Sequence, residues 1–118
     1  MSYDLAVWEG DRPEDDAAGG RCFSDLYDRY VDSDERHPPT ERISRYVAAL
    51  LDRWPDVTQD EHDISPWSTG PLIGEACGPL IYFPMRYGMA EEASAYAAHV
   101  AASMGLVCFD PQERRLRS

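Results

Sequence analysis

The chain has 118 residues, a formal net charge of −11 and a hydrophobic fraction of 43%. This length predicts one domain, residues 1–118, that buries roughly two-thirds of its unfolded surface without metal or disulfide staples. The hydrophobic fraction argues against wholesale disorder. The 22 acidic against 11 basic residues argue against nucleic acid as a partner, because a phosphate-binding surface needs clustered bases.

The cysteines indicate a reducing compartment. Cys22, Cys77 and Cys108 form an odd set without CxxC spacing, as expected of free thiols in the cytoplasm. Residues 1–20 lack the apolar segment of a signal peptide, and no apolar run approaches the length of a membrane span. We therefore expect a cytoplasmic protein that does not contact membranes.

The N-terminal third predicts a strand, an acidic loop and a helix. Tyr3 to Glu9 alternates weakly, which predicts a strand buried on most of both faces. Asp11 to Gly20 is expected to be an acidic loop. From about Ala17 to Asp32 the apolar residues recur every three or four positions, which is typical of an amphipathic helix. Its apolar stripe consists of Cys22, Phe23, Leu26, Tyr27, Tyr30 and Val31.

A second helix follows, starting at Pro39-Thr40-Glu41. Thr40 is the expected N-cap, Glu41 suits the positive end of the helix dipole, and Pro55 ends the helix. The spacing of its apolar residues favours packing side by side with the preceding helix on one face of a sheet. The stripe comprises Ile43, Val47, Leu50, Leu51 and Trp54.

The segment 56–70 shows no periodicity and is predicted to be a loop. Loops of this length in compact domains often carry function. Trp67, which follows Pro66, is expected to tuck inward and hold the loop. The alternative is an exposed Trp67 that anchors a partner.

The C-terminal half predicts a hairpin, a helix and a buried strand. The apolar segments 71–76 and 79–85 flank a turn at Cys77-Gly78, and Pro84 implies an edge position or a bulge. An alanine-rich helix over 89–104 follows. Gly105 can take the left-handed conformation that ends a helix.

The run from Leu106 to Phe109 predicts a strand covered on both faces and central to the fold, and Asp110-Pro111 then turns the chain. Residues 112–117 are a candidate fifth strand. The expected order is β-α-α-β-β-α-β-(β), an α+β fold with three helices on a mainly antiparallel sheet of four to five strands.

The sequence offers no pattern typical of a catalytic, metal or cofactor site. His62 lies among Asp60, Glu61 and Asp63, but adjacent residues do not converge easily on one metal ion. Cys108 precedes Asp110 by two positions, and a thiol inside a buried strand is generally inert. We therefore expect a protein that is not an enzyme and uses no cofactor.

Three separated pieces carry a family resemblance: Tyr3 to Glu9 (YDLAVWE), Ser65 to Ser68 (SPWS) and Gly105 to Gln112 (GLVCFDPQ). Together they resemble a group of small bacterial proteins, common in actinobacteria, that open with a DLxVW strand and close with a GLVCYDPQ-like strand and turn. Some of these look like immunity proteins of contact-dependent or polymorphic toxin systems. The resemblance implies a toxin-neutralising role, and it supplies no catalytic residues. The acidic segment 11–16 and the arginine-rich tail depart from the shared pattern.

The resulting hypothesis is an acidic, immunity-like inhibitor that masks the basic active face of a toxin enzyme. Attraction between opposite charges raises the association rate of such a pair. The alternative is a small-ligand protein or enzyme with a pocket near the 56–70 loop, lined by Trp67, Tyr82 and His62. The predicted partner-binding residues are Asp56, Asp60, Glu61, Asp63 and Trp67, with Asp11, Glu14, Asp15 and Asp16 as a second patch.

Overall fold

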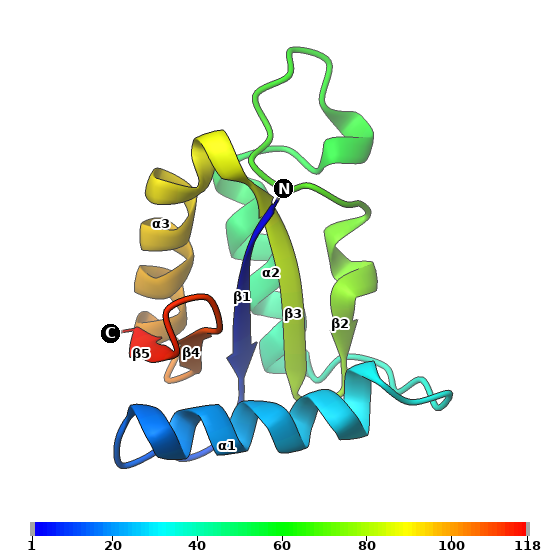
Figure 1. The fold of residues 1–118 in the computed structure, drawn as a ribbon. Helices are drawn as coiled ribbons and strands as arrows, with labels where there is room; N and C mark the ends of the chain where they lie inside the picture. The colour runs from blue at the N-terminus through cyan, green and yellow to red at the C-terminus, as the bar shows by residue number, and fades with distance from the viewer. Residues whose placement is uncertain (1, 118) are drawn as a thin grey trace.

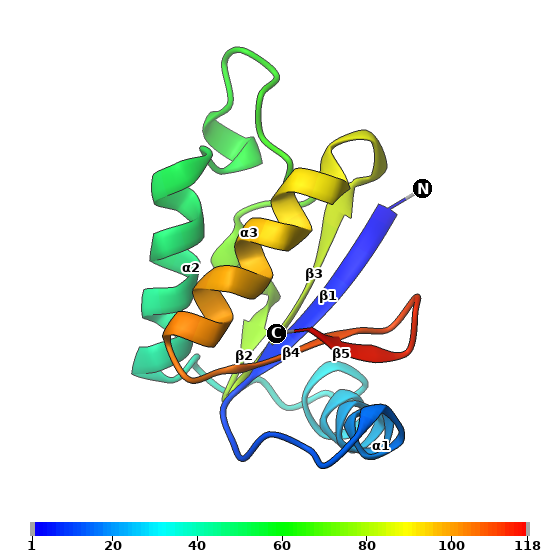
Figure 2. The ribbon, with the colours of Figure 1, turned by 90° about the vertical axis from the view of Figure 1, so that its left-hand side faces the viewer.

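The fold is one antiparallel sheet with helices on both faces (Figures 1 and 2). The computed structural model describes residues 2–117. The five strands lie in the order β2-β3-β1-β4-β5. In chain order the elements are β1 (Ser2–Trp8), α1 (Asp16–Leu26), α2 (Glu41–Arg53), β2 (Ala76–Cys77), β3 (Leu80–Arg86), α3 (Ala90–Ser103), β4 (Val107–Asp110) and β5 (Arg115–Arg117). The predicted α+β class, the element order and the fifth strand are confirmed.

β1 is the central strand. It pairs with β3 from Ser2 to Trp8 and with β4 from Ala6 to Trp8. β4 is fully buried on both faces, as predicted, but it lies one place from the centre because β5 pairs along its other side. The prediction that β4 is the central strand is therefore wrong, and a β5 of only three residues explains the difference.

α2 and α3 pack together on one face of the sheet (Figure 2). They cover the side chains of Leu5 and Val7 from β1 and Phe83 from β3. The alanines of α3 allow close approach, and the buried Tyr46 hydroxyl of α2 donates a hydrogen bond of 2.9 Å to the Ala97 carbonyl. Thr40 caps α2 as predicted, because its hydroxyl accepts from the Ile43 N–H at 3.3 Å.

α1 lies on the opposite face, so the prediction that the first two helices pack side by side is wrong. β1 carries apolar side chains on both of its faces. A sheet that is apolar on both faces needs a packed layer against each face. α1 and the π-helical turn that continues it (Tyr27–Val31) cover Ala6, Trp8 and Phe109. The chain then rounds the β2–β3 turn, where the Thr40 N–H donates to the Gly78 carbonyl at 3.0 Å.

α1 and the turn that continues it span nearly the predicted range, Ala17 to Asp32, whereas the predicted acidic loop extends too far and one stripe residue is misplaced. The helix begins at Asp16, inside the expected acidic loop, because the Asp15 carboxylate accepts from the Ala18 N–H at 2.8 Å and caps it. Cys22, which was assigned to the apolar stripe, is exposed. The covering face is formed mainly by Phe23, Leu26 and Tyr30.

Two punctuating residues behave as predicted. Gly105 has a φ of 70°, the left-handed conformation that ends α3, and the Leu106 N–H bonds back to the Ala101 carbonyl at 2.9 Å. The Pro84 carbonyl accepts from the Ser68 N–H at 3.1 Å on the side of β3 away from β1. The side of β3 on which Pro84 lacks an N–H group therefore faces only the short segment 66–68. At Pro84, β3 behaves as an edge strand on this side.

A buried carboxylate organises the β4–β5 turn. Asp110 has no exposed surface, and its Oδ1 accepts from the backbone N–H groups of Gln112 at 3.0 Å and Glu113 at 3.1 Å. Its Oδ2 accepts from the Tyr3 hydroxyl and lies 3.6 Å from the Arg117 guanidinium. The Gln112 side chain in turn pairs with the Asp4 backbone, donating to its carbonyl at 2.7 Å and accepting from its N–H at 2.6 Å.

Candidate functional site

The predicted loop 56–70 lies at one end of the molecule, beyond the end of α2 and the start of α3 (Figures 1 and 2). It is more ordered than the sequence predicts. It contains a short 3-10 turn, Val57–Gln59, and its own acidic side chains hold its backbone. We call this end, formed by residues 52–63 and 88–95, the acidic end.

Asp56 fixes the start of the loop. Its carboxylate accepts from the Thr58 N–H at 3.0 Å, from the Thr58 hydroxyl at 2.9 Å and from the Leu72 N–H at 2.8 Å. Partial burial alone would raise the pKa of Asp56, but these three donors outweigh it and hold the pKa below its ordinary value. Gly70 passes so close that a Cβ there would lie 2.5 Å from the Asp56 carboxylate, so the closure requires glycine.

Asp60 fixes the tip of the loop in the same way. It accepts from the backbone N–H groups of Ser65 at 2.8 Å, Ile64 at 3.0 Å and His62 at 3.3 Å. These donors, the Ser65 N–H first, lower the pKa of Asp60. Asp56 and Asp60 thus accept hydrogen bonds from the backbone around their own loop, a structural role that the sequence pattern did not predict.

The loop should lose order in acid. Both carboxyl groups have folded pKa values below the ordinary value of 3.8, so protonation favours the unfolded chain. Their stabilisation is complete above that ordinary value and is lost as the pH falls through the lower folded values. We expect hydrogen exchange at the Ser65 and Leu72 amides to accelerate below about pH 4, relative to core amides.

Asp60→Asn provides the comparison. An amide cannot ionise, so the variant should exchange faster at neutral pH and show a flatter pH profile at Ser65. An Asp60→Asn profile that coincides with the wild type across this range would contradict the assigned role of Asp60.

Trp67 is a core residue. Its side chain is 0% exposed and packs edge-on against Trp54, with ring centroids 5.8 Å apart, and against Phe83 at 5.9 Å. Its indole N–H donates to the Trp54 carbonyl at 3.4 Å. The predicted inward placement of Trp67 is confirmed. The alternative, an exposed Trp67 that anchors a partner, is wrong because Trp54 and Phe83 pack against the Trp67 ring and bury it.

The remaining acids of the loop point to solvent. Asp63 has 82% of its side chain exposed and pairs with Arg86 at 2.7 Å. Glu61 is exposed and forms no ion pair with any residue from 2 to 117. Of the predicted partner-binding residues in this loop, Glu61 is therefore the one whose charge is free for another molecule.

A groove that the sequence analysis missed lies beside this loop. Its volume is about 540 Å³, and its walls are formed by Trp54, Pro66, Gly88, Met89, Glu91, Glu92 and Ala95. The Arg53 guanidinium lies 4.2 Å above the Trp54 ring and 3.3 Å from the Glu92 carboxylate. No sequence pattern indicates this groove, because three segments build it and Trp54 fits a core stripe equally well.

The second predicted patch does not join the first. It lies at the start of α1, at the opposite end of the molecule (Figures 1 and 2). Asp15 is the N-cap of α1, and Asp16 accepts from the Leu116 N–H at 2.9 Å. Asp11 and Glu14 are exposed. A single contact surface cannot combine this patch with the acidic end.

The alternative pocket lined by Trp67, Tyr82 and His62 is not formed. Trp67 belongs to the core under α2 and α3, whereas Tyr82 points to the other face and packs against Phe23 at 5.4 Å. His62 is exposed on the loop. The sheet separates the two aromatic residues, so this prediction is wrong.

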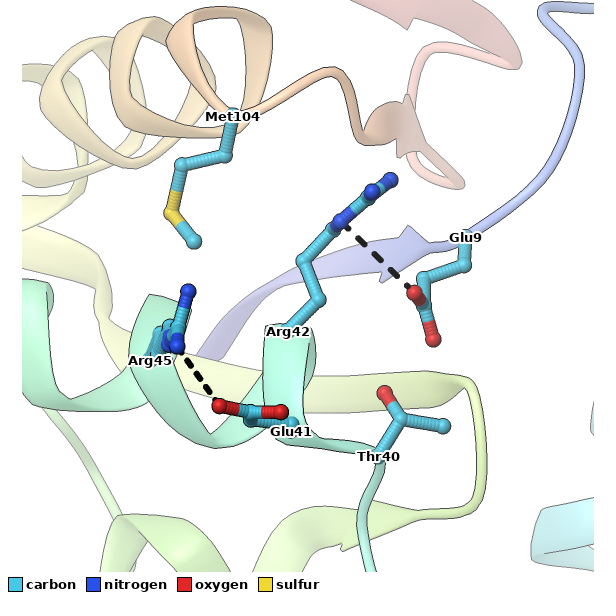
Figure 3. A pocket seen from close by; sticks show the side chains of 6 residues that line it. All are labelled: Glu9, Thr40, Glu41, Arg42, Arg45 and Met104. Atoms are coloured by element: carbon cyan, nitrogen blue, oxygen red, sulfur yellow. Dashed lines mark hydrogen bonds and ion pairs between the residues drawn. The ribbon is translucent and has the colours of Figure 1, made fainter.

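Another groove, of about 430 Å³, lies between α2 and the ends of β1 and α3 (Figure 3). Its charges pair with one another: Arg42 lies 3.7 Å from Glu9, and Arg45 lies 2.6 Å from Glu41. Thr40 and Met104 complete the lining. Because the charges are internally compensated, this groove offers little electrostatic attraction to a ligand.

The potentially reactive groups are few in the described part of the chain. The Cys108 thiol is 2% exposed, and burial raises its pKa to about 12, so it stays protonated and poorly nucleophilic. Within residues 2–117 no three His, Cys, Asp or Glu side chains are placed to share a metal ion. No helix in that range is long and apolar enough to cross a bilayer.

Comparison of the chain with protein-family models, with curated proteins and with solved structures gave no match.

Proposed function

We propose that this chain is a binding protein that docks its acidic end onto a basic protein, as an immunity protein does when it covers the active face of a toxin enzyme. The observation that carries the proposal is the groove between Trp54, Pro66 and Met89, which has carboxylates on its rim. An apolar floor with a charged rim is the ordinary anatomy of a protein–protein interface.

Rigidity supports this surface as a docking site. Asp56 and Asp60 hold the adjoining loop through six hydrogen bonds, which the loop does not have to form on binding. A preformed surface loses less conformational entropy on association than a mobile one. The loop therefore presents Glu61 and the groove presents Glu91 without a large ordering cost.

Arg53 shows which chemistry fits the groove. Its guanidinium stacks on Trp54 and pairs with Glu92, the two interactions that arginine makes at interfaces. Glu91, which forms no ion pair within residues 2–117, is the rim carboxylate left for an arginine or lysine of a partner. The net charge of −11 adds a long-range attraction that raises the association rate and is screened by salt.

The family resemblance gives the partner class. Proteins with similar strand motifs include immunity-like ones, and toxin enzymes that act on nucleic acid carry the clustered bases that phosphate binding requires. The alternative of a small-ligand pocket lined by Trp67 and Tyr82 is not favoured, since these residues lie on opposite faces of the sheet. We assign the groove beside the 56–70 loop to a protein partner because carboxylates stand on its rim.

Charge reversal at Glu61 and Glu91 tests the proposal. Immobilised wild-type chain should retain a basic protein from lysate of the source cells, and Glu61→Arg/Glu91→Arg chain should not. With the partner purified, calorimetry should show an affinity at least about tenfold lower for the double variant and a flatter dependence on salt. Co-expression of the wild type, and not of the variant, should protect cells from a partner that is a toxin.

The control reverses as much charge elsewhere. Asp25 and Asp28 are exposed on α1 and the turn after it, form no ion pair within residues 2–117, and lie on the far side of the sheet. Asp25→Arg/Asp28→Arg chain should keep the partner and lose only the long-range share of the attraction. Equal weakening by both double variants would mean that net charge, rather than the acidic end, governs binding.

A further inference from the structure

A third groove lies on the face opposite α2 and α3, between α1 and the β4–β5 turn. Its volume is about 640 Å³, within the range of about 300–1,000 Å³ typical of small-molecule sites. Its floor is apolar and comprises Ala17, Phe23, Phe109 and Pro111. The rings of Phe23 and Phe109 are stacked, with centroids 5.7 Å apart and an interplanar angle of 29°.

Small residues of α1 create this space. A Cβ on Gly19 would come within 3.0 Å of Leu116 and 3.2 Å of Phe109, so Gly19 lets the helix approach the sheet. Gly20 lines the groove itself, and a Cβ there would lie 3.7 Å from the Phe109 ring, an ordinary contact. The bare backbone at Gly20 thus leaves space in the groove that a larger side chain would fill.

Two arginines stand at the mouth of the groove. Arg21 and Arg114 both line it, and neither forms an ion pair with a residue from 2 to 117. The one acid in the lining, Asp16, uses its carboxylate to accept from the Leu116 N–H at 2.9 Å.

Arg114 is also held in an unfavourable backbone conformation. Its φ is 54°, a left-handed value that glycine adopts without strain and arginine rarely does. The turn thus places an arginine beside the groove at a position where glycine would be the easier choice.

We propose that this groove binds a small aromatic carboxylate, whose ring packs against Ala17, Phe23 and Pro111 and whose carboxylate pairs with Arg21 and Arg114. The apolar lining favours an apolar ring, for which the partly exposed Phe23 is the aromatic contact. Guanidinium groups pair with carboxylates through short, charge-assisted hydrogen bonds. α1, which forms one wall of the groove, lies at the opposite end of the molecule from the 56–70 loop (Figure 1), and the groove shares no lining residue with the one at the acidic end.

The test compares two probes of the same shape, 1-naphthaleneacetate and its neutral amide, 1-naphthaleneacetamide. Isothermal titration with the full chain should show the carboxylate binding about tenfold more tightly than the amide. Amide chemical shifts on titration should change at Gly20, Arg21 and Phe109. No binding at millimolar carboxylate, equal affinity for both probes, or shift changes centred elsewhere would each overturn the proposal.

The variants are chosen to keep the fold. Arg114→Gly removes a charge and relieves the backbone strain, and Arg21→Ala keeps a good helix former. Both should bind the carboxylate no better than the wild type binds the amide. Gly20→Leu fills the groove over Phe109 and raises helix propensity, so it should abolish binding of both probes while its thermal midpoint does not fall.

Arg29→Ala is the matched control. Arg29 is exposed on the turn after α1, forms no ion pair within residues 2–117 and does not line the groove. This variant should bind both probes as the wild type does. A loss of carboxylate affinity in Arg29→Ala equal to that in Arg21→Ala would show that general charge, rather than the groove, attracts the probe, and would overturn the assignment.

Discussion

Asp110→Ala is expected to lower the free energy of unfolding by about 3–5 kcal/mol, the cost of breaking a buried charged pair. The fully buried carboxylate serves the Tyr3 hydroxyl, two backbone N–H groups of the turn and Arg117. Removing it leaves these donors without an acceptor in a place that water does not reach. Because small domains have only about 5–15 kcal/mol to lose, chemical denaturation should show a large shift of the midpoint.

Asp110→Asn separates the hydrogen bonds from the charge. The amide oxygen can still accept from the turn, so its loss should be about half as large. Asp28→Ala, at an exposed position, should stay within about 0.5 kcal/mol of the wild type. An Asp110→Ala chain whose unfolding midpoint matches that of Asp28→Ala would refute a structural role for this carboxylate.

Trp67→Ala should have an effect of similar size, about 3–5 kcal/mol, as expected when a buried aromatic residue is truncated. The ring fills the space between Trp54 and Phe83, and its indole N–H is bonded to the Trp54 carbonyl. Urea unfolding should measure the loss, and faster hydrogen exchange in the 60–70 segment should accompany it.

Trp67→Phe is the conservative comparison and should lose less, since it keeps part of the ring contact. A residue that anchors a partner gives the opposite pattern: the affinity falls while the unfolding midpoint is retained. If Trp67→Ala unfolds at the same urea concentration as the wild type, its placement in the core is contradicted.

Periodicity predicted the elements better than it predicted their positions. The strand predicted at Tyr3–Glu9, the helix that begins after Thr40 and the strand after Gly105 follow from local patterns, and the structure contains all of them. The sheet face that α1 covers could not be predicted in this way. An amphipathic stripe shows which side of a helix is buried, but it does not show which face of the sheet the helix packs against. The sequence feature that did indicate helices on both faces of the sheet is the presence of apolar residues on both faces of β1.

The candidate site was predicted only in part. Acidic residues of a loop look alike in a sequence whether they face solvent or bind backbone, so the structural use of Asp56 and Asp60 was not evident. Among the predicted residues of the 56–70 loop, Glu61 is the one whose exposed charge is free of ion pairs within residues 2–117. The groove beside it required the approach of Trp54, Pro66 and Glu91, which no local pattern contains.

The residues that carry the family resemblance have structural roles. The opening and closing motifs pair side by side in the sheet, Val7 opposite Cys108, and are tied by Gln112 to Asp4. The middle motif runs along β3, where Trp67 bridges to Met85. These three pieces therefore build the scaffold, and the partner binding that we propose should depend on residues outside them.

The sheet ends on both sides in very short strands, of two residues in β2 and three in β5. A long bare strand offers unpaired N–H and C=O groups on which another chain can polymerise, and short or charged margins prevent this. At the β5 margin, Arg115 and Arg117 would also place like charges opposite each other if two copies met there in antiparallel fashion. The short edge strands β2 and β5 should therefore keep the protein from forming fibrils at high concentration.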